Sequence, residues 1–262
     1  MKFKKEGGLQ TKGYIKDSTH KKPLITIVTV VYNGQEHLEE TILSIINQTY
    51  SNIEFIIIDG GSTDNTIDIV RKYEHAIDYW VSEKDDGIYD AMNKASNLAK
   101  GQWINYMNCG DTFCNNEVIE KIQFNHYSKY VMVYGNAKIF SGNRKFLKSQ
   151  KSFKMSKFNL TVFVTGVVCH QAVFYNKDIE FKYPDNYKLK GELYSYFEYI
   201  SHGKAIRIDL DICNFFLDGI GRKKIQENIK EAWSVLKVHV GIMRILYIPM
   251  NLYLKLRLIN ER

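Results

Sequence analysis

Continuous apolar runs alternate with helix-like stretches in the first half of the chain. The run at 24–31 (LITIVTVV) is rich in β-branched residues, and the run at 53–59 (IEFIIID) resembles it. Uninterrupted apolar runs of this length are typical of strands buried on both faces of a parallel sheet. Between them, residues 37–48 carry their apolar side chains at helical spacing, which predicts an amphipathic helix.

The same alternation continues to about residue 107. A helix is expected from Thr66, a strand at 77–83, a helix at 85–101 and a strand at 102–107. Strands that alternate with helices through short loops predict an α/β fold with a doubly wound, mostly parallel sheet and right-handed crossovers.

The second half is less regular. Residues 129–140 predict a strand pair or one long strand, and residues 162–175 predict more extended chain. A helix is expected at 191–203 and a strand at 205–216.

Three segments follow from these patterns. Residues 1–22 are polar and Lys-rich without sustained periodicity, which predicts a mobile or loosely docked basic arm. Residues 23–216 form the predicted domain, and residues 217–262 form a basic helical tail. The chain of 262 residues is 45% hydrophobic, enough to bury a sizeable core.

The charge distribution argues against nucleic acid as a partner. The net charge is +7, but residues 222–262 hold nine Lys or Arg against three Asp or Glu, so the preceding body is nearly neutral. A duplex-binding protein normally presents a basic face on its folded body. The four cysteines form no CxxC pair, and no apolar leader with a cleavage site precedes them. A cytoplasmic location is therefore expected.

Polar residues follow three of the predicted strands. VYNG begins at Val31, DGGS at Asp59, and NCGD ends at Asp111. Ligands of open α/β sheets bind beyond the carboxyl ends of the strands, so these loops should converge on one crevice. The carboxylate of Asp111 either holds a divalent cation there or caps a helix that begins near Asn115.

The order of these motifs resembles a known enzyme family. PLITIVTVVYNGQEHLEETILSIINQTYSNIEFIIIDGGSTDNTIDIV and SEKDDGIYDAMNKASNLAKGQWINYMNCGDTF are similar to the family 2 glycosyltransferases, inverting enzymes of GT-A fold that use nucleotide-diphospho sugars. The resemblance is dense over 23–125 and looser to about 216. It implies a nucleotide-binding half at 23–125 and an acceptor-binding half at 126–216.

The resemblance assigns roles at the strand ends. Val30, Tyr32 and Asn33 would flank the base of the nucleotide-sugar donor, and Asp59 would form the acidic turn. By resemblance, a UDP-sugar is the expected donor. The metal-binding motif falls on NCGD, where Asn108 lines the nucleotide-sugar site and Asp111 is the expected ligand of Mn²⁺ or Mg²⁺. Two positions depart from the family pattern: Gly60 stands where many members have a second acid that touches uracil, and Asn108 stands where many have Asp.

Further roles follow for the segment DDGIYDAMNK. Asp86, Asp90 and Asn93 are the candidates for lining the nucleotide and sugar pocket. Alternatively, Asp86 caps the helix and Asp90 is a solvated acid in its first turn, favoured by the helix dipole.

The acceptor half supplies the proposed base. By resemblance, Glu192 is the general base that removes the proton from the acceptor hydroxyl. Alternatively, it is only a favourable charge in the first turn of a helix. His170 and Gln171 would line the acceptor pocket, although a lone His beside apolar strand residues is more often structural.

The tail has two interpretations. Residues 235–259 are strongly apolar, but Lys237, Arg244 and Pro249 interrupt them, as do Lys255 and Arg257, which argues against a membrane span. The pattern favours helices that lie in the interface of an anionic membrane, as peripheral contact at the inner face of the plasma membrane. The alternative is packing on the core or against a second subunit in a homo-oligomer. The membrane interpretation suits a lipid-linked acceptor, such as a polyprenyl-diphosphate glycan in bacterial surface-polysaccharide or O-antigen biosynthesis.

The sequence also bears on two other function classes, a dinucleotide oxidoreductase and a non-catalytic binding or scaffold protein. A dinucleotide oxidoreductase needs GxGxxG after the first strand, and VYNGQEHL lacks it. A non-catalytic sugar-binding or scaffold protein of the same fold stays open, because Gly60 and Asn108 reduce the number of acids.

Overall fold

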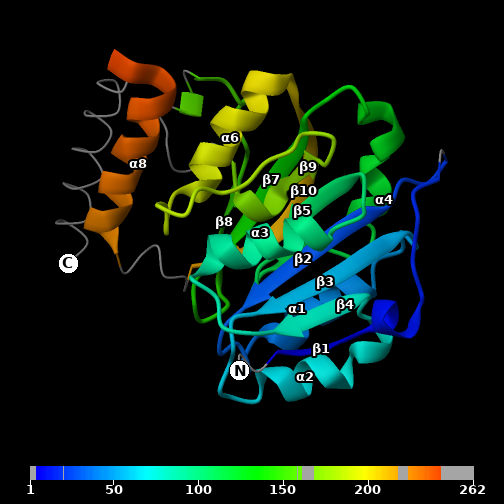
Figure 1. The fold of residues 1–262 in the computed structure, drawn as a ribbon. Helices are drawn as coiled ribbons and strands as arrows, with labels where there is room; N and C mark the ends of the chain where they lie inside the picture. Colours follow the sequence, from blue (N-terminus) through cyan, green and yellow to red (C-terminus); the bar gives the residue numbers. More distant parts are fainter. Residues whose placement is uncertain (1–3, 20, 158, 161–167, 218–223, 243–262) are drawn as a thin grey trace.

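The four apolar runs of the first half form neighbouring parallel strands in the computed structural model, which describes residues 4–19, 21–157, 159–160, 168–217 and 224–242. The strand order in the sheet is β1-β4-β3-β2-β5-β9-β7-β10-β6, and β8 pairs with β7 (Figure 1). The chain builds outward from β2 through β3 to β4 and then crosses to β5 on the other side. This reversal between β2 and β5 is the place where sheets of this kind bind ligands.

The strands are β1 (Lys5–Gly7), β2 (Ile25–Val31), β3 (Ile53–Asp59), β4 (Tyr79–Ser82), β5 (Trp103–Tyr106), β6 (Thr112–Phe113), β7 (Met132–Phe140), β8 (Phe146–Gln150), β9 (Val173–Asn176) and β10 (Ala205–Phe216). The α-helices are α1 (Leu38–Ile46), α2 (Thr66–Lys72), α3 (Ile88–Leu98), α4 (Val118–Ile122), α6 (Gly191–His202) and α8 (Ile225–Val240). Short 3₁₀ turns are η1 (Leu9–Lys12), η2 (Glu74–Ala76), η3 (Phe124–Tyr127) and η4 (His170–Ala172).

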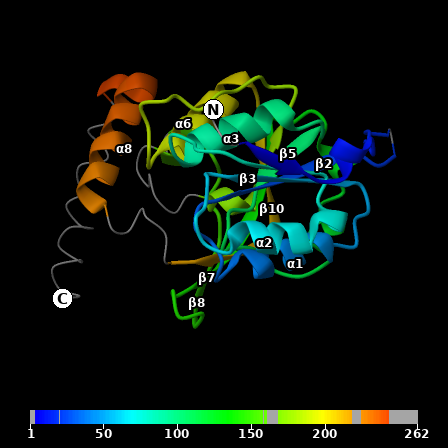
Figure 2. The ribbon, with the colours of Figure 1, turned by 60° about the horizontal axis from the view of Figure 1, so that its bottom comes forward.

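Each face of the sheet has its own hydrophobic core. Alternate residues of β2 point to opposite faces, so that Val28 packs with α3, α6 and α8 while Ile27 packs with α1, α2 and α4. Figure 2 shows α3 and α6 on one side of the sheet and α1 and α2 on the other. Coverage on both faces explains why these strands are continuously apolar.

The second half departs from a simple alternation. Residues 132–140 form one long strand, β7, which resolves the choice left open at 129–140. β9 is inserted between β5 and β7 and runs antiparallel to both. Of the predicted extended stretch 162–175, residues 162–167 lie outside the described part, residues 170–172 form η4, and extended chain begins at Val173.

The prediction of a loosely attached arm at 1–22 is wrong for residues 5–16. β1 pairs antiparallel with β4 at the edge of the sheet. Gln10 Nε2 donates to the buried Glu54 Oε1 at 2.7 Å, and Lys16 Nζ lies 2.9 Å from the buried Asp78 Oδ2. Buried carboxylates are costly without partners. The arm adds one partner to each carboxylate, beside Thr26 and Lys100 at Glu54 and Phe55 N at Asp78, which the polar composition of its sequence did not indicate.

The described part of the tail is a packed helix. α8 lies against α6, and its Ala232, Val235 and Leu236 are fully buried in the core. For residues 225–240 the structure therefore supports packing on the body. Residues 243–262 of the predicted tail lie outside the described part. Among the described helices, none has the length and apolarity that a bilayer crossing requires.

Candidate functional site

The three predicted loops meet at one edge of the sheet. Gly60 N donates to Val31 O at 2.9 Å, which joins the ends of β2 and β3. Cys109 N donates to Val30 O at 3.3 Å, which joins the NCGD loop to β2. The predicted convergence of VYNG, DGGS and NCGD is confirmed.

The end of β2 carries the exposed ring of Tyr32 and the hydrogen-bonded side-chain amide of Asn33. Tyr32 is 65% exposed, so its ring is accessible for stacking. Asn33 adopts a left-handed backbone with φ 50°, and its Oδ1 accepts from Thr63 N at 2.9 Å. Asn33 N also donates to Ser62 Oγ at 2.7 Å. Asn33 thus fixes the first loop against the second.

Asp59 braces its own turn. Its carboxylate is buried and accepts from Gly61 N at 3.1 Å, Ser62 N at 3.0 Å and Ser82 Oγ at 2.6 Å. The Ser62 hydroxyl donates to its other oxygen. Four donors around a 1% exposed carboxylate favour a positioning role over direct contact with a base.

Asp111 is held by the acceptor half. Its Oδ2 accepts from Gln171 Nε2 at 2.7 Å and its Oδ1 from Phe216 N at 3.0 Å. The helix-cap alternative is wrong, because α4 begins at Val118, after the N-cap Glu117. Gln171, predicted to bind the acceptor, therefore orients the predicted metal ligand.

The NCGD loop also offers a second oxygen. Asn108 Oδ1 is buried and has no hydrogen-bond partner among the described residues. The described residues contain no group of three or more His, Cys, Asp and Glu arranged to hold a metal. The oxygens of Asp111 and Asn108 are of the ligand type that a hard cation takes together with phosphate oxygens.

The candidates in DDGIYDAMNK have mainly structural partners. Asp90 Oδ2 accepts from Asp86 N at 3.1 Å and lies 3.3 Å from Lys94 Nζ, in agreement with a first-turn acid. Gly87, not Asp86, is the N-cap of α3. Asn93 exchanges two hydrogen bonds with the Tyr183 backbone, at 2.8 and 2.9 Å. Asn93 therefore joins α3 to the acceptor half and does not face the crevice.

Glu192 lies where the two halves touch. It is the second residue of α6, and its Oε2 accepts from the hydroxyl of Tyr89, on the donor-side helix α3. Its Oε1 lies 3.5 Å from Lys190 Nζ. Burial, and next the Glu192 carboxylate, raise the pKa of Tyr89, so the phenol stays a donor at neutral pH. The structure thus presents a carboxylate beside the donor loop.

His170 lies in an aromatic environment. Its ring is stacked on Tyr106 with centroids 5.5 Å apart, and Nδ1 shares a 3.0 Å hydrogen bond with the Tyr175 hydroxyl. Burial lowers the pKa of His170 to about 4, so the ring is neutral near pH 7. Its buried Nε2 has no partner in the described part of the chain. A neutral imidazole with one unused nitrogen suits a substrate contact.

Sequence reasoning missed Tyr89 and Arg144. Arg144 lies in the β7–β8 hairpin, where Nη1 donates to Gly110 O at 3.2 Å and the guanidinium lies 3.8 Å from the Phe216 ring centroid. It brings a positive charge beside the NCGD loop. The apolar periodicity gave no signal for either residue, because both act through contacts distant in sequence.

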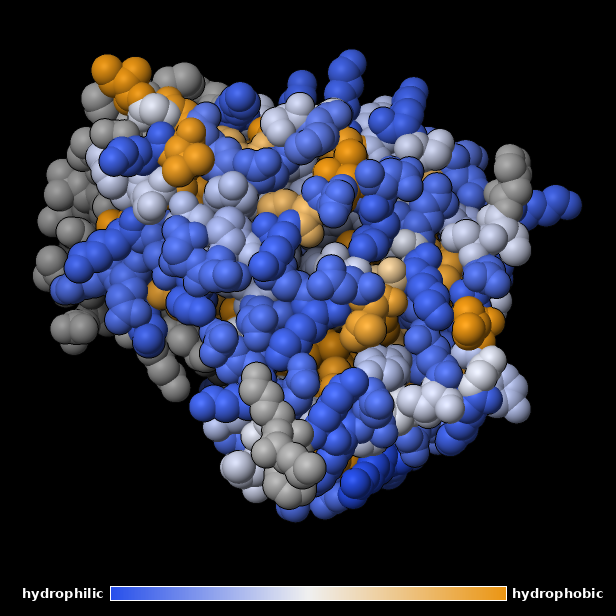
Figure 3. All heavy atoms as spheres, in the orientation of Figure 1, coloured by the Kyte–Doolittle hydropathy of each residue, from blue (hydrophilic) through white to orange (hydrophobic). Residues whose placement is uncertain are grey.

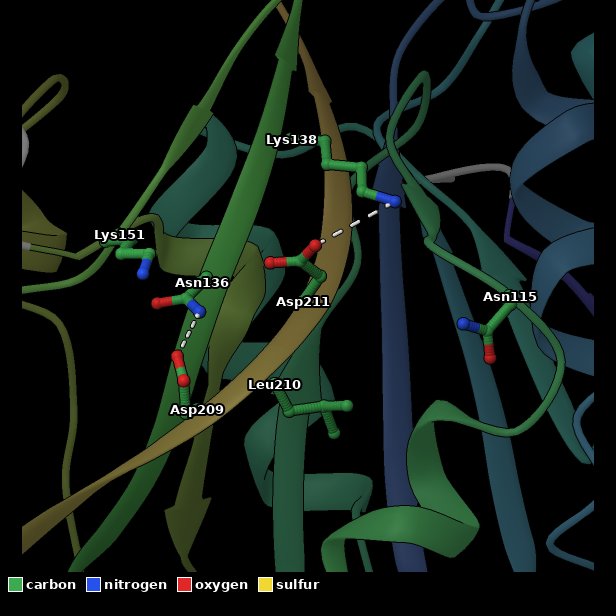
Figure 4. A pocket seen from close by; sticks show the side chains of 7 residues that line it. All are labelled: Asn115, Asn136, Lys138, Lys151, Asp209, Leu210 and Asp211. Atoms are coloured by element: carbon green, nitrogen blue, oxygen red, sulfur yellow. Dashed lines mark hydrogen bonds and ion pairs between the residues drawn. The ribbon is translucent and has the colours of Figure 1, made fainter.

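A polar hollow of about 410 Å³ lies away from these residues. Figure 4 shows it along β7 and β10, with ion pairing between Lys138 and Asp211. Its lining is Asn115, Asn136, Lys138, Lys151, Asp209, Leu210 and Asp211. It includes none of the predicted site residues, so the loop crevice and this hollow are separate features.

Comparisons with known proteins identify the family. The model of glycosyl transferase family 2 matches residues 26–202. An uncharacterized glycosyltransferase of Haemophilus influenzae is 33% identical over 117 residues, 44% of this chain and 47% of that protein. The putative teichuronic acid biosynthesis glycosyltransferase TuaG of Bacillus subtilis is 31% identical over 109 residues, 40% of this chain and 43% of TuaG. The matched segments span less than half the length of these relatives.

Solved structures show the fold. S. aureus TarS 1-349 in complex with UDP aligns with TM-score 0.63 at 16% identity, over 82% of this chain and 65% of that one. Mannosyltransferase PcManGT from Pyrobaculum calidifontis, in complex with GDP-Man and Mn2+, aligns with TM-score 0.62 at 16% identity, over 84% and 65%. These likenesses confirm the predicted GT-A fold. With the family model spanning 26–202, the chain belongs to glycosyl transferase family 2.

Proposed function

We propose that the protein transfers a sugar, with inversion, from a UDP-sugar to a hydroxyl of a surface glycan or polyprenyl-diphosphate-linked glycan. Family membership supports transfer of a sugar. The names of similar proteins support the donor and acceptor classes, since TarS is described with UDP and UDP-GlcNAc and TuaG is named for teichuronic acid biosynthesis.

One observation carries the mechanism: Glu192 of the acceptor half accepts a hydrogen bond from Tyr89 of the donor half, 103 residues away. A base for glycosyl transfer must lie on the acceptor side and within reach of the donor sugar. Glu192 belongs to the acceptor half, and its hydrogen bond to Tyr89 of α3 supports the second condition. Tyr89 and Lys190 hold its carboxylate in one orientation, which is the pre-organisation that a general base requires.

The reaction then proceeds as one in-line displacement. The acceptor oxygen attacks the anomeric carbon from the side opposite the diphosphate, and Glu192 takes the hydroxyl proton. The new carbon–oxygen bond forms as the bond to the diphosphate breaks, and the electron pair leaves with UDP. Arg144, beside Gly110, adds positive charge near the departing group.

The NCGD loop is the proposed metal site. Asp111 and the unpartnered Asn108 oxygen would hold Mn²⁺ or Mg²⁺ together with diphosphate oxygens. A bound divalent cation would neutralise charge on the leaving diphosphate. Gln171 and the Phe216 N–H orient the Asp111 carboxylate for this purpose.

The test is Glu192→Gln, assayed as UDP release from a panel of UDP-sugars with Mn²⁺ and a glycan-lipid extract as acceptor. Turnover should fall by about 10²–10⁴, because base catalysis is lost while the shape is retained. UDP affinity, measured by calorimetry, should stay within about twofold. The control is Glu198→Gln on the same helix, whose carboxylate lies 3.6 Å from His239. Wild-type turnover in Glu192→Gln would remove this residue from the mechanism.

The proposed metal site is tested by the same calorimetric titrations of UDP, carried out with Mn²⁺ or with EDTA. Asp111→Asn should weaken Mn²⁺-dependent UDP binding at least tenfold and leave binding in EDTA unchanged. Equal titrations for the variant and the wild type would make Asp111 a structural link between NCGD and β10.

Peripheral contact with the inner face of the membrane belongs to this proposal. Val238 and Ile242 are 63% and 80% exposed at the end of α8, where Figure 3 shows hydrophobic atoms on an otherwise mostly hydrophilic face. Flotation with anionic vesicles should succeed for the full chain and weaken for the variant Val238→Ser with Ile242→Ser. Equal flotation of both would assign the contact elsewhere.

A further inference from the structure

The end of β3 leaves room for a carboxylate from the next loop. A Cβ placed on Gly60 would lie 2.7 Å from Asp85 Oδ2 and 3.1 Å from its Cγ. Contacts this short are not tolerated, so any other residue at 60 would displace Asp85. The Asp85 side chain therefore occupies the space into which a side chain at 60 would project. Gly60 stands where many members of the family carry a second acid, and Asp85 supplies a carboxylate at the same place.

Of the two carboxylates beside Gly60, Asp59 and Asp85, the one with an oxygen that accepts no hydrogen bond from the described residues is Asp85. Asp59 already accepts from four donors. Asp85 Oδ1 accepts from Gly87 N at 3.0 Å, and in the described part of the chain no residue donates a hydrogen bond to Oδ2. Asp85 is half-buried, and the burial raises the pKa of its carboxyl group.

The order of the loops sets which part of a nucleotide Asp85 would meet. The loops after β5, β2, β3 and β4 lie side by side in that order. A diphosphate at Asp111, after β5, places the rest of the nucleotide along this row. It passes the exposed Tyr32 ring after β2 and ends with the base beside Gly60 and Asp85.

Asp85 can select among bases because an ionised carboxylate only accepts hydrogen bonds. Uracil presents one N3–H donor, which matches the single unused oxygen, Oδ2. Cytosine and adenine present an acceptor nitrogen at the corresponding edge, which a carboxylate repels. Guanine presents two adjacent donors, and its second donor would have to share Oδ1 with Gly87 N.

We infer that Asp85 is the residue that selects uracil, by accepting the N3–H of the base from the loop after β4, and that Gly60 exists to admit it. The inference rests on the proposed UDP-sugar function and names the specificity residue of that site. A charge-assisted hydrogen bond of this kind is expected to change affinity about 10- to 100-fold.

The test compares calorimetric titrations of UDP, GDP and CDP, with Mn²⁺, into wild type and Asp85→Asn. Wild type should prefer UDP. The variant should lose about 10- to 100-fold in UDP affinity and gain relative affinity for CDP, since the Asn amide donates to cytosine N3. The control is Glu83→Gln in the same loop, whose carboxylate pairs with Lys94 at 3.1 Å.

Two more variants test whether the position of the carboxylate, and not a general loss of folding, sets the affinity for UDP. Gly60→Ala keeps Asp85 but pushes its carboxylate away, so it should reproduce the loss of UDP affinity. The double variant Gly60→Asp with Asp85→Gly moves the carboxylate to the β3 loop and should restore the preference for UDP. Thermal melting checks that each variant is folded.

The outcomes distinguish the two proposals. Unchanged base preference in Asp85→Asn, with UDP bound and released by wild type, would overturn the role of Asp85 and leave the glycosyltransferase reaction intact. A wild type that prefers GDP would also overturn the assignment of uracil. A wild type that binds no nucleoside diphosphate would remove the proposed function and this inference with it.

Discussion

The predicted donor half, residues 23–125, and the predicted acceptor half, residues 126–216, hold their candidate site residues in different ways. In the donor half, Asp59 is fixed by donors two, three and 23 positions along the chain. In the acceptor half, Glu192 depends on Tyr89 103 residues away. Short loops therefore shape the proposed donor pocket, whereas tertiary docking shapes the proposed catalytic contact. Substitutions in the donor half should therefore lower UDP affinity, whereas substitutions in the acceptor half should lower kcat.

Among variants that displace a candidate site residue without replacing it, Gly191→Ala in the acceptor half should have the largest effect. A Cβ at Gly191 would lie 2.8 Å from the ring of Tyr89, and a ring cannot yield as a flexible chain end can. The start of α6 would shift and carry Glu192 with it. Misplacement of a catalytic group by about 1 Å costs on the order of 10² in rate. We expect about 100-fold lower kcat, with UDP affinity within about twofold by calorimetry.

Gly60→Ala is the matched variant in the donor half. There the added methyl displaces Asp85, so UDP affinity should fall while kcat at saturating donor is retained. Ser201→Ala, at the far end of α6, controls for a general effect on that helix. If both glycine variants changed the same kinetic constant, the division of labour between the halves would be refuted.

Glu231→Ala should have the next largest effect. The Glu231 carboxylate, on α8, accepts from the backbone N–H groups of Lys188, Leu189 and Lys190, at 2.7 to 3.1 Å. These three residues lead directly into Glu192. Loss of the acceptor leaves partly buried donors unpaired, at about 1–3 kcal/mol of unfolding free energy.

The measurements for this variant are urea unfolding and kcat. We expect kcat to fall about tenfold, because the approach to α6 loosens, and the UDP affinity to be nearly unchanged. Glu227→Ala, one turn earlier, removes only an exposed pair with Lys224 and is the control. Lower stability with unaltered kcat would make Glu231 a purely structural residue.

The same contrast explains what the sequence could predict. The run IEFIIID predicts the strand 53–59, and β3 is Ile53–Asp59. Such elements follow from local apolar patterns, so the alternating elements and the meeting of three loops were within reach. The bond from Phe216 N to Asp111 spans 105 residues and has no local signature. The partners of Asp111 and Glu192 could not be read from the sequence for that reason.

The terminal segments show a second limit. A Lys-rich stretch without periodicity predicts a loose arm. The arm docks nevertheless, because Glu54 and Asp78 are each 1% exposed in the sheet and need partners. Burial of an acid within an apolar run is set by the tertiary fold. Sequence patterns therefore identified the strands but not the distant residues that pair with their buried acids.

The two halves should also respond differently to acid, first through His170. Its pKa is about 4, below the ordinary 6.5, because the ring is buried. In the unfolded chain the imidazole is protonated below pH 6.5, whereas in the folded chain it is protonated only below about pH 4. The unfolding free energy should therefore fall over this range, by up to about 1.4 kcal/mol per pH unit. Urea unfolding of wild type should show this extra slope relative to His170→Gln; equal slopes would place His170 in contact with solvent.

Asp85 should produce the smallest effect, with the opposite sign for stability. Burial raises the pKa of Asp85, against the lowering effects of the Gly87 N–H and of Lys94, so the folded chain binds this proton at higher pH than the unfolded chain. The unfolding free energy of wild type should thus rise relative to Asp85→Asn as the pH falls through the raised pKa. UDP affinity should fall over the same interval, because the carboxylate that accepts the base N–H is lost. Calorimetry and urea unfolding on the same two proteins would reveal the coupling: a UDP affinity that stays constant while the stability difference grows would show that Asp85 titrates without touching the nucleotide.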